Sequence, residues 1–71
     1  MGASFWTEKS NQGWAVKKGG IEITVRSSQS DAWAETRRLA RGADGAAYLK
    51  GSDGRIRAKN TYGKDPFRKK G

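Results

Sequence analysis

The alternation of apolar and polar residues predicts strands in the first third of the chain. Residues 21–26, Ile-Glu-Ile-Thr-Val-Arg, alternate with period two, which is typical of a strand with one buried face. Its apolar residues are expected to point toward a core: Ile21, Ile23 and Val25. Shorter segments at residues 4–9 and 14–17 have a similar character, and Gly19-Gly20 supplies a turn because glycine reaches positive φ without steric cost. We therefore expect three strands here.

The pattern changes to a helical period after residue 28. Ser28 followed by Asp31 matches a capping box in its acidic form, and residues 30–41 are good helix formers that end at Gly42. One stripe carries the small and apolar residues Ala32, Thr36, Leu39, Ala40 and Ala43. The opposite side carries the charged residues Glu35, Arg38 and Arg41. This pattern predicts a helix packed along one side.

A hairpin is predicted after the helix. Residues 46–50 and 55–59 have strand character and flank Gly51-Ser52-Asp53-Gly54, whose Asp-Gly pair is a strong turn signal. Alternation directs Leu49 and Ile56 inward. It directs the basic residues of both strands outward: Lys50, Arg55, Arg57 and Lys59.

The order of elements is therefore β-β-β-α-β-β, which predicts the α+β class. The simplest arrangement is a small antiparallel sheet with one helix packed on one face. We expect a single basic domain over residues 1–66, followed by a mobile basic tail at residues 67–71. A core of this size rarely contributes more than about 3–5 kcal/mol, so a homo-oligomer is left open as added support.

Charge is distributed unevenly and points to a polyanionic partner. Residues 1–36 carry four basic and four acidic groups, whereas residues 37–71 carry eleven basic and three acidic ones, so the net charge of +8 arises in the second half. A one-sided excess favours binding of DNA or RNA through phosphates over a purely solubilising surface. The sequence therefore predicts a nucleic-acid-binding protein.

Three groups of residues are candidates for phosphate contacts. Arg55, Arg57 and Lys59 are two residues apart and would form a ladder on one face of a strand, which Lys50 joins across the hairpin. The helix and the tail supply further basic residues: Arg38 and Arg41, and Lys64, Arg68 and Lys69. Tyr48 is predicted on the same side as Lys50, where its ring would either stack on a base or pack under the tail.

Catalysis is not expected. The chain has no histidine and no cysteine, which removes the commonest acid-base groups, nucleophiles and zinc ligands, and no cofactor or metal is predicted. Asp31 and Glu35 lie one helical turn apart, but capping and ion pairing explain them more simply than a cation site. No apolar run approaches the roughly 20 residues of a membrane span, and no secretory signal is recognised, so we expect a cytoplasmic location without a membrane partner.

A protein-interaction module is the alternative function. Such a module, an inhibitor or adaptor, would dock its basic surface on an acidic partner surface. The unpaired edges of a short sheet offer a second docking mode by strand addition.

Three strings in order resemble a known family. These are Gly13-Trp14-Ala15-Val16-Lys17, Asp53-Gly54-Arg55-Ile56-Arg57, and Tyr62-Gly63-Lys64-Asp65-Pro66. Together they resemble the small bacterial domain-of-unknown-function family 2188 over roughly residues 12–71. The resemblance implies the same order of elements and an important C-terminal segment, although the chain ends in Phe67-Arg68-Lys69-Lys70-Gly71 where a proline-rich end is expected. It implies no biochemical activity, so function is argued from the residues.

Overall fold

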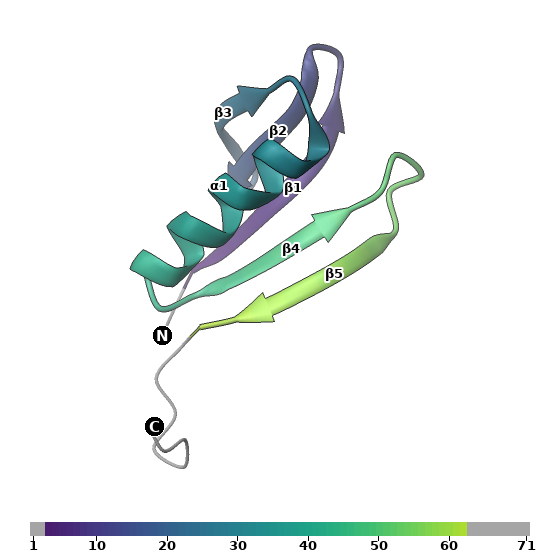
Figure 1. Cartoon of the computed structure of the whole chain (residues 1–71). Coiled ribbons are helices and arrows are strands. Elements are labelled where there is room, and N and C mark those ends of the chain that lie inside the picture. The colour runs from purple at the N-terminus through teal and green to yellow at the C-terminus, as the bar shows by residue number, and fades with distance from the viewer. Residues whose placement is uncertain (1–2, 63–71) are drawn as a thin grey trace.

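A computed structural model describes residues 3–62 of the chain as one helix and five strands (Figure 1). The elements are β1 (Ser4–Ser10), β2 (Gly13–Lys18), β3 (Ile21–Arg26), α1 (Gln29–Gly42), β4 (Ala46–Lys50) and β5 (Ile56–Thr61). This confirms the α+β class and the predicted order of elements. The predictions for the tail, which include Lys64, Arg68 and Lys69, lie outside the described residues.

The five strands form one mixed sheet in the order β3-β2-β1-β4-β5. Three neighbouring pairs are antiparallel, but the central strands β1 and β4 are parallel, with Phe5 opposite Ala47 and Thr7 opposite Leu49. The prediction of an antiparallel sheet is therefore wrong for this pair. The reason is the helix: α1 carries the chain back along the sheet, so β4 starts at the same end as β3 and runs in its direction and that of β1.

Local signals fix the ends of α1. The backbone N–H of Asp31 donates to the Ser28 side-chain oxygen at 3.2 Å, which confirms the predicted cap. Asp31 in the first turn and Arg41 in the last complement the helix dipole. Beyond the helix, Asp44 adopts φ 54°, a left-handed conformation that Asp tolerates better than most residues.

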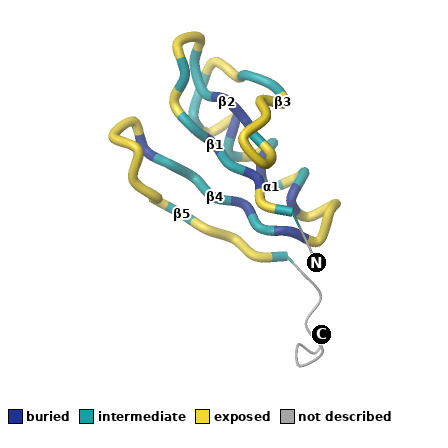
Figure 2. The backbone as a smooth tube through the Cα atoms, turned by 180° about the vertical axis from the view of Figure 1, so that it is seen from behind, coloured by how far each residue is buried: buried dark blue, intermediate teal, exposed yellow. Residues whose placement is uncertain are grey.

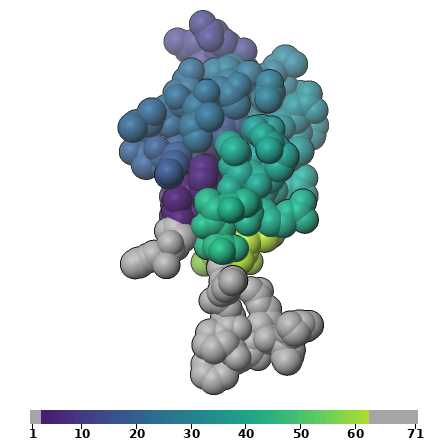
Figure 3. Space-filling model, turned by 90° about the vertical axis from the view of Figure 1, so that its left-hand side faces the viewer, coloured from purple at the N-terminus to yellow at the C-terminus, as the bar shows by residue number. Residues whose placement is uncertain are grey.

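The helix covers one face of the sheet through small side chains. Ala32, Thr36 and Ala40 are spaced by four residues and are buried against it, and Ala40 forms the main apolar cluster with Phe5 and Ala47. Figure 2 shows the buried segments of the backbone in dark blue. Partly buried residues surround this cluster: Ala3, Trp33, Leu39 and Tyr62. On the helix side, α1 and the β2–β3 hairpin form one continuous surface (Figure 3). No helix among residues 3–62 is long and apolar enough to cross a membrane.

A buried pair of hydroxyl groups lies between β1 and the helix. The Thr7 and Thr36 hydroxyl oxygens lie 2.5 Å apart, and the Thr36 hydroxyl donates to the backbone oxygen of Ala32 at 2.8 Å. Because side chains alternate along a strand, Phe5 and Thr7 face α1 while Trp6 and Glu8 point to the other side.

Strand β3 does not bury the residues that its alternation predicts. Ile21 is 72% exposed and Ile23 is 46% exposed. The pairing with β2 shifts between Val16 and Lys17, so that Ile23 is an extra residue in β3. In addition, β3 is an edge strand, and Thr24, opposite Val16, is on the helix side. The prediction that Ile21, Ile23 and Val25 lie in the core is therefore wrong: Ile21 and Ile23 are exposed, and Val25, opposite Ala15, is half-buried on the side away from the helix.

The β4–β5 hairpin contains a similar irregularity. Its predicted turn at residues 51–54 is confirmed, and Leu49 is half-buried on the helix side. The pairing shifts between Leu49 and Lys50, which brings Ile56 opposite Lys50 and leaves Arg57 as the extra residue. Ile56 is consequently 55% exposed, so its predicted inward position is wrong.

Candidate functional site

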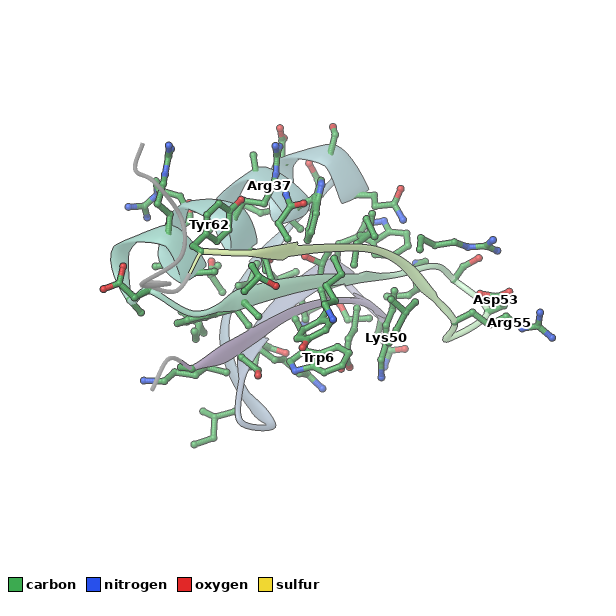
Figure 4. The ribbon with its side chains drawn as sticks, turned by 90° about the horizontal axis from the view of Figure 1, so that it is seen from below. Trp6, Arg37, Lys50, Asp53, Arg55 and Tyr62 are labelled. Atoms are coloured by element: carbon green, nitrogen blue, oxygen red, sulfur yellow. The ribbon has the colours of Figure 1, made fainter. Side chains whose placement is uncertain are left out.

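The face of the sheet away from α1, called the open face below, carries a continuous set of aromatic and charged side chains. Directly paired residues on neighbouring strands point to the same side, so the register arranges them in rows. One row crosses all five strands and contains Glu22, Lys17, Trp6, Tyr48 and Lys59. In the adjacent row, Glu8 on β1 lies beside Lys50 on β4. Figure 4 shows Trp6 and Lys50 projecting from the side opposite to Arg37 and Tyr62.

Trp6 and Tyr48 form a stacked aromatic pair at the centre of this face. Their ring centroids are 4.2 Å apart and their planes differ by 16°. Neighbouring strands are separated by about 4.8 Å, so the two rings stand side by side on β1 and β4 with their faces directed along the row. Both residues are half-buried, which leaves part of each ring accessible.

Two lysines lie against these rings. The Lys50 ammonium is 5.1 Å from the Trp6 ring centroid, and the Lys59 ammonium is 5.9 Å from that of Tyr48. Both distances are within the range of about 6 Å for a cation-π contact. The cations therefore lie close to the aromatic surfaces that a planar ligand would use.

Glu8 is the carboxylate at the centre of the open face. It lies 3.3 Å from the Lys17 ammonium and 3.6 Å from that of Lys50. Each of these three side chains is between 27% and 33% exposed. Such partly solvated pairs contribute only about 0–1 kcal/mol, so an incoming anion can replace Glu8 as the partner of either lysine. The six residues Lys17, Trp6, Tyr48, Lys59, Glu8 and Lys50 are called the open-face cluster below.

The predicted ladder of Arg55, Arg57 and Lys59 does not form. Strand β5 begins at Ile56, so Arg55 lies in the turn, and Arg57 is the extra residue of the irregular pairing. Asp53 binds both arginines, at 3.1 Å from Arg57 and 3.9 Å from Arg55, and accepts the backbone N–H of Arg55. Figure 4 shows Asp53 and Arg55 at the tip of the hairpin, away from Trp6.

The helix arginines are separated from the open face by the sheet. Arg38 donates to Glu35 through two nitrogens, and this hydrogen bond is the main reason that the pKa of the Glu35 carboxyl lies below its ordinary value. The same contact raises the pKa of Arg38. Arg41 is exposed in the last turn of α1. These two predicted residues therefore form a different surface from Lys50 and Lys59.

Of the seven predicted residues that the structure describes, it brings three together on the open face: Tyr48, Lys50 and Lys59. Sequence reasoning did not assign Trp6, Lys17 and Glu8 to the site. The sequence did contain one signal, since consecutive large residues at Phe5 and Trp6 must point to opposite sides of a strand. It did not show which of the two faced the helix.

Potential metal ligands are scattered in the part of the chain that the structure describes. Within residues 3–62, histidine, cysteine, aspartate and glutamate do not form a cluster of three or more. Asp31 lies beside the helix cap, and Glu35 is paired with Arg38 and, at 3.8 Å, with Arg26. The contacts of Glu35 thus agree with ion pairing, while Asp31 contacts the cap through its backbone N–H and not through its carboxylate.

Comparison with known proteins matches the chain to one family model. The model of a family described as an uncharacterized protein conserved in bacteria (DUF2188) matches residues 5–62. The match includes all of the open-face cluster. No curated protein matches the chain, and no solved structure matches it.

Proposed function

This chain belongs to the bacterial DUF2188 family, and we propose that it is a non-catalytic protein that binds nucleic acid through phosphates. The observation that carries the proposal is the open-face cluster, in which Lys17, Lys50 and Lys59 surround the Trp6–Tyr48 pair. The contacts would be electrostatic, because each lysine that neutralises a phosphate releases counterions.

The charge of the whole chain favours such a partner. Residues 3–62 carry eleven basic and six acidic groups, a net charge of +5. The full chain carries +8. A positive surface raises the association rate with polyanions and holds them weakly until specific contacts form. The open face adds the aromatic rings that a merely solubilising surface does not need.

Other basic groups are less suitable as the main contact. Arg55 and Arg57 are both bound by Asp53, and Arg38 is bound by Glu35. On the open face, Lys17 and Lys50 are likewise paired with Glu8, but Lys59 has no carboxylate partner among the described residues, and the aromatic pair lies beside these lysines. The open face is therefore the better candidate for the phosphate site.

The first test removes two open-face cations. We expect Lys50→Gln combined with Lys59→Gln to weaken binding and to reduce the slope of log affinity against log salt by about 1.4 for a single strand or 1.8 for a duplex, because each lost phosphate contact removes about 0.7 or 0.9. The measurement is a titration of labelled DNA or RNA at several salt concentrations, monitored by fluorescence anisotropy.

The matched control removes two cations from the helix. Arg38→Gln combined with Arg41→Gln changes the net charge by the same amount on the opposite side of the sheet, and we expect it to leave the slope unchanged. Equal reductions in both double variants would show that only net charge matters. Absence of binding by the unaltered protein at low salt would refute nucleic-acid binding.

The second test concerns Glu8. We expect Glu8→Gln to tighten binding about fivefold at about 0.1 M salt, because it frees Lys17 and Lys50 and adds roughly one neutralised phosphate. The same titration measures the effect. Asp44→Asn is the matched control, since it removes one negative charge beyond α1 and asparagine tolerates φ 54°. If Asp44→Asn tightens binding as much as Glu8→Gln does, Glu8 has no local role.

A protein-interaction module is the second candidate function, and the β3 edge favours it. Ile21 and Ile23 expose apolar surface on a strand whose outer edge is unpaired among the described residues. Such an edge can accept an additional strand from a partner. A chain that binds no nucleic acid at low salt but retains a partner sensitive to substitutions in β3 would support this alternative.

A further inference from the structure

We propose that the open face takes a single-stranded nucleic acid whose unpaired bases stack on the Trp6–Tyr48 pair. This inference rests on the proposed nucleic-acid binding and specifies the form of the ligand. It rests on the orientation of the two rings, on the lysines beside them, and on the position of α1.

The outer face of Tyr48 is the accessible stacking surface. Because the two rings stack face to face, one face of Tyr48 is covered by Trp6 and the other is directed along the row toward Lys59 on the edge strand β5. Lys59 is exposed, and its ammonium lies 5.9 Å from the Tyr48 ring, near the limit of a cation-π contact. A long flexible side chain held at that distance can move aside for a base and then contact the adjacent phosphate.

The lysine beside Trp6 has more contacts than the lysine beside Tyr48. Lys50 lies closer to the Trp6 ring, at 5.1 Å, and is also paired with Glu8. We therefore place the first stacked base beside Tyr48 and assign Lys50 to a phosphate. The row from Lys17 to Lys59 spans three strand spacings, about 14 Å. Sheets of this kind that present aromatic residues stack two or three bases.

A duplex would make poor use of this surface. Its bases are already stacked inside, so upright rings would meet only sugars and phosphates. An α-helix or a two-stranded ribbon can enter the major groove, but α1 lies on the opposite face of the sheet. At the tip of the β4–β5 ribbon, Arg55 and Arg57 are both paired with Asp53, which competes with phosphates for these cations. The open face thus favours a strand whose bases are free.

The experiment compares three ligands with the full-length, unaltered protein at one low salt concentration. The ligands are an oligothymidylate of about 12 nucleotides, within the usual range of single-strand site sizes, a strand of equal length made entirely of abasic sites, and a duplex of equal length. The abasic strand keeps the phosphates and lacks the bases. We expect the oligothymidylate to bind between about 5-fold and 150-fold more tightly than the abasic strand, the range expected from one stacked base. It should also bind more tightly than the duplex.

Tyr48 variants test where the base stacks. We expect Tyr48→Leu, which keeps an apolar side chain without a ring, to reduce the ratio of oligothymidylate to abasic affinity to nearly one. Tyr48→Phe is the control and should retain the ratio, because stacking needs the ring and not the hydroxyl group. If Tyr48→Leu does not fold, the comparison of ligands with the unaltered protein still decides the proposal.

The outcomes separate the two proposals. Equal affinity for the abasic strand and the oligothymidylate would overturn base stacking while leaving phosphate binding intact. A duplex that binds as tightly as the single strand would also overturn it. Failure of all three ligands to bind would overturn both the single-strand proposal and nucleic-acid binding itself.

Discussion

The Gly13→Ala variant is expected to be largely unfolded at 25 °C. Gly13 has φ +136°, and a β-carbon there would lie 2.3 Å from the backbone oxygen of Arg26. An unfavourable φ costs about 1–3 kcal/mol, and forced repacking costs about 1–3 kcal/mol more. A domain of this size has only about 3–5 kcal/mol to lose. Circular dichroism during thermal unfolding measures the loss directly.

Gly42→Ala is the matched control for this substitution. Gly42 is the last residue of α1, and a β-carbon there meets no atom within 4 Å. We expect alanine to stabilise the protein by about 0.5–1 kcal/mol, because glycine in a helix carries an entropic cost. A Gly13→Ala protein that melts at the temperature of the unaltered one would show that β2 and β3 do not approach as closely as described.

The same contact explains the glycine in the Gly13-Trp14-Ala15-Val16 string. Strand β2 begins at Gly13, directly beside the end of β3, and there is no room for a side chain between them. This string, which continues to Lys17 and is one of the three that carry the family resemblance, is therefore a structural feature of the β2–β3 pair in its first four residues. It contributes Ala15 and Val16 to the buried residues, and its last residue, Lys17, belongs to the open-face cluster.

The elements were predictable because their signals are local. The Ser28 cap, the run of helix formers and the Asp53-Gly54 turn each depend on a few neighbouring residues, and all three are present. The parallel pairing of β1 and β4 depends instead on contacts between residues about 40 positions apart, such as Phe5 and Ala47. No local pattern specifies such a pairing.

The errors in side-chain direction have one physical cause. An extra residue in a strand, Ile23 in β3 or Arg57 in β5, reverses the alternation on one side of it. Ile23 and Arg57 both fit the regular alternation of apolar and polar residues around them, so the sequence contains no sign of the irregularity. This is why Ile56 was expected inside and why the arginine ladder was expected on one face.

The candidate site was predictable only in its C-terminal half. Tyr48, Lys50 and Lys59 lie in one hairpin, where alternation and the turn position are enough to bring them together. Trp6 and Lys17 come from other strands and reach the site through the pairing of β1 with β4 and β2. Their side of the sheet depends on which face of β1 the helix covers, and the helix covers the face that carries Phe5 and Thr7.

Thr36→Val is expected to destabilise the protein by about 1–3 kcal/mol, the cost of leaving a buried polar group without a partner. Both threonines are fully buried, and the Thr36 hydroxyl donates its hydrogen to Ala32. The Thr7 hydroxyl must then donate to the Thr36 oxygen. Valine at position 36 removes that acceptor and leaves the Thr7 hydroxyl unpaired in the interior.

Removing the other hydroxyl group, in Thr7→Val, is expected to reduce the free energy of unfolding by less. The difference between the two substitutions tests the contact between β1 and α1. In Thr7→Val the Thr36 hydroxyl still donates to Ala32, so we expect a loss of about 0.5–1.5 kcal/mol. The double variant removes both hydroxyl groups and should be nearly as stable as the unaltered protein. Urea unfolding of the unaltered protein, the two single variants and the double variant measures the coupling energy between the two residues, which we expect to be about 0.5–3 kcal/mol. Strictly additive losses would mean that Thr7 does not face Thr36. Because side chains alternate along β1, Trp6 and Glu8 would then no longer be held on the open face.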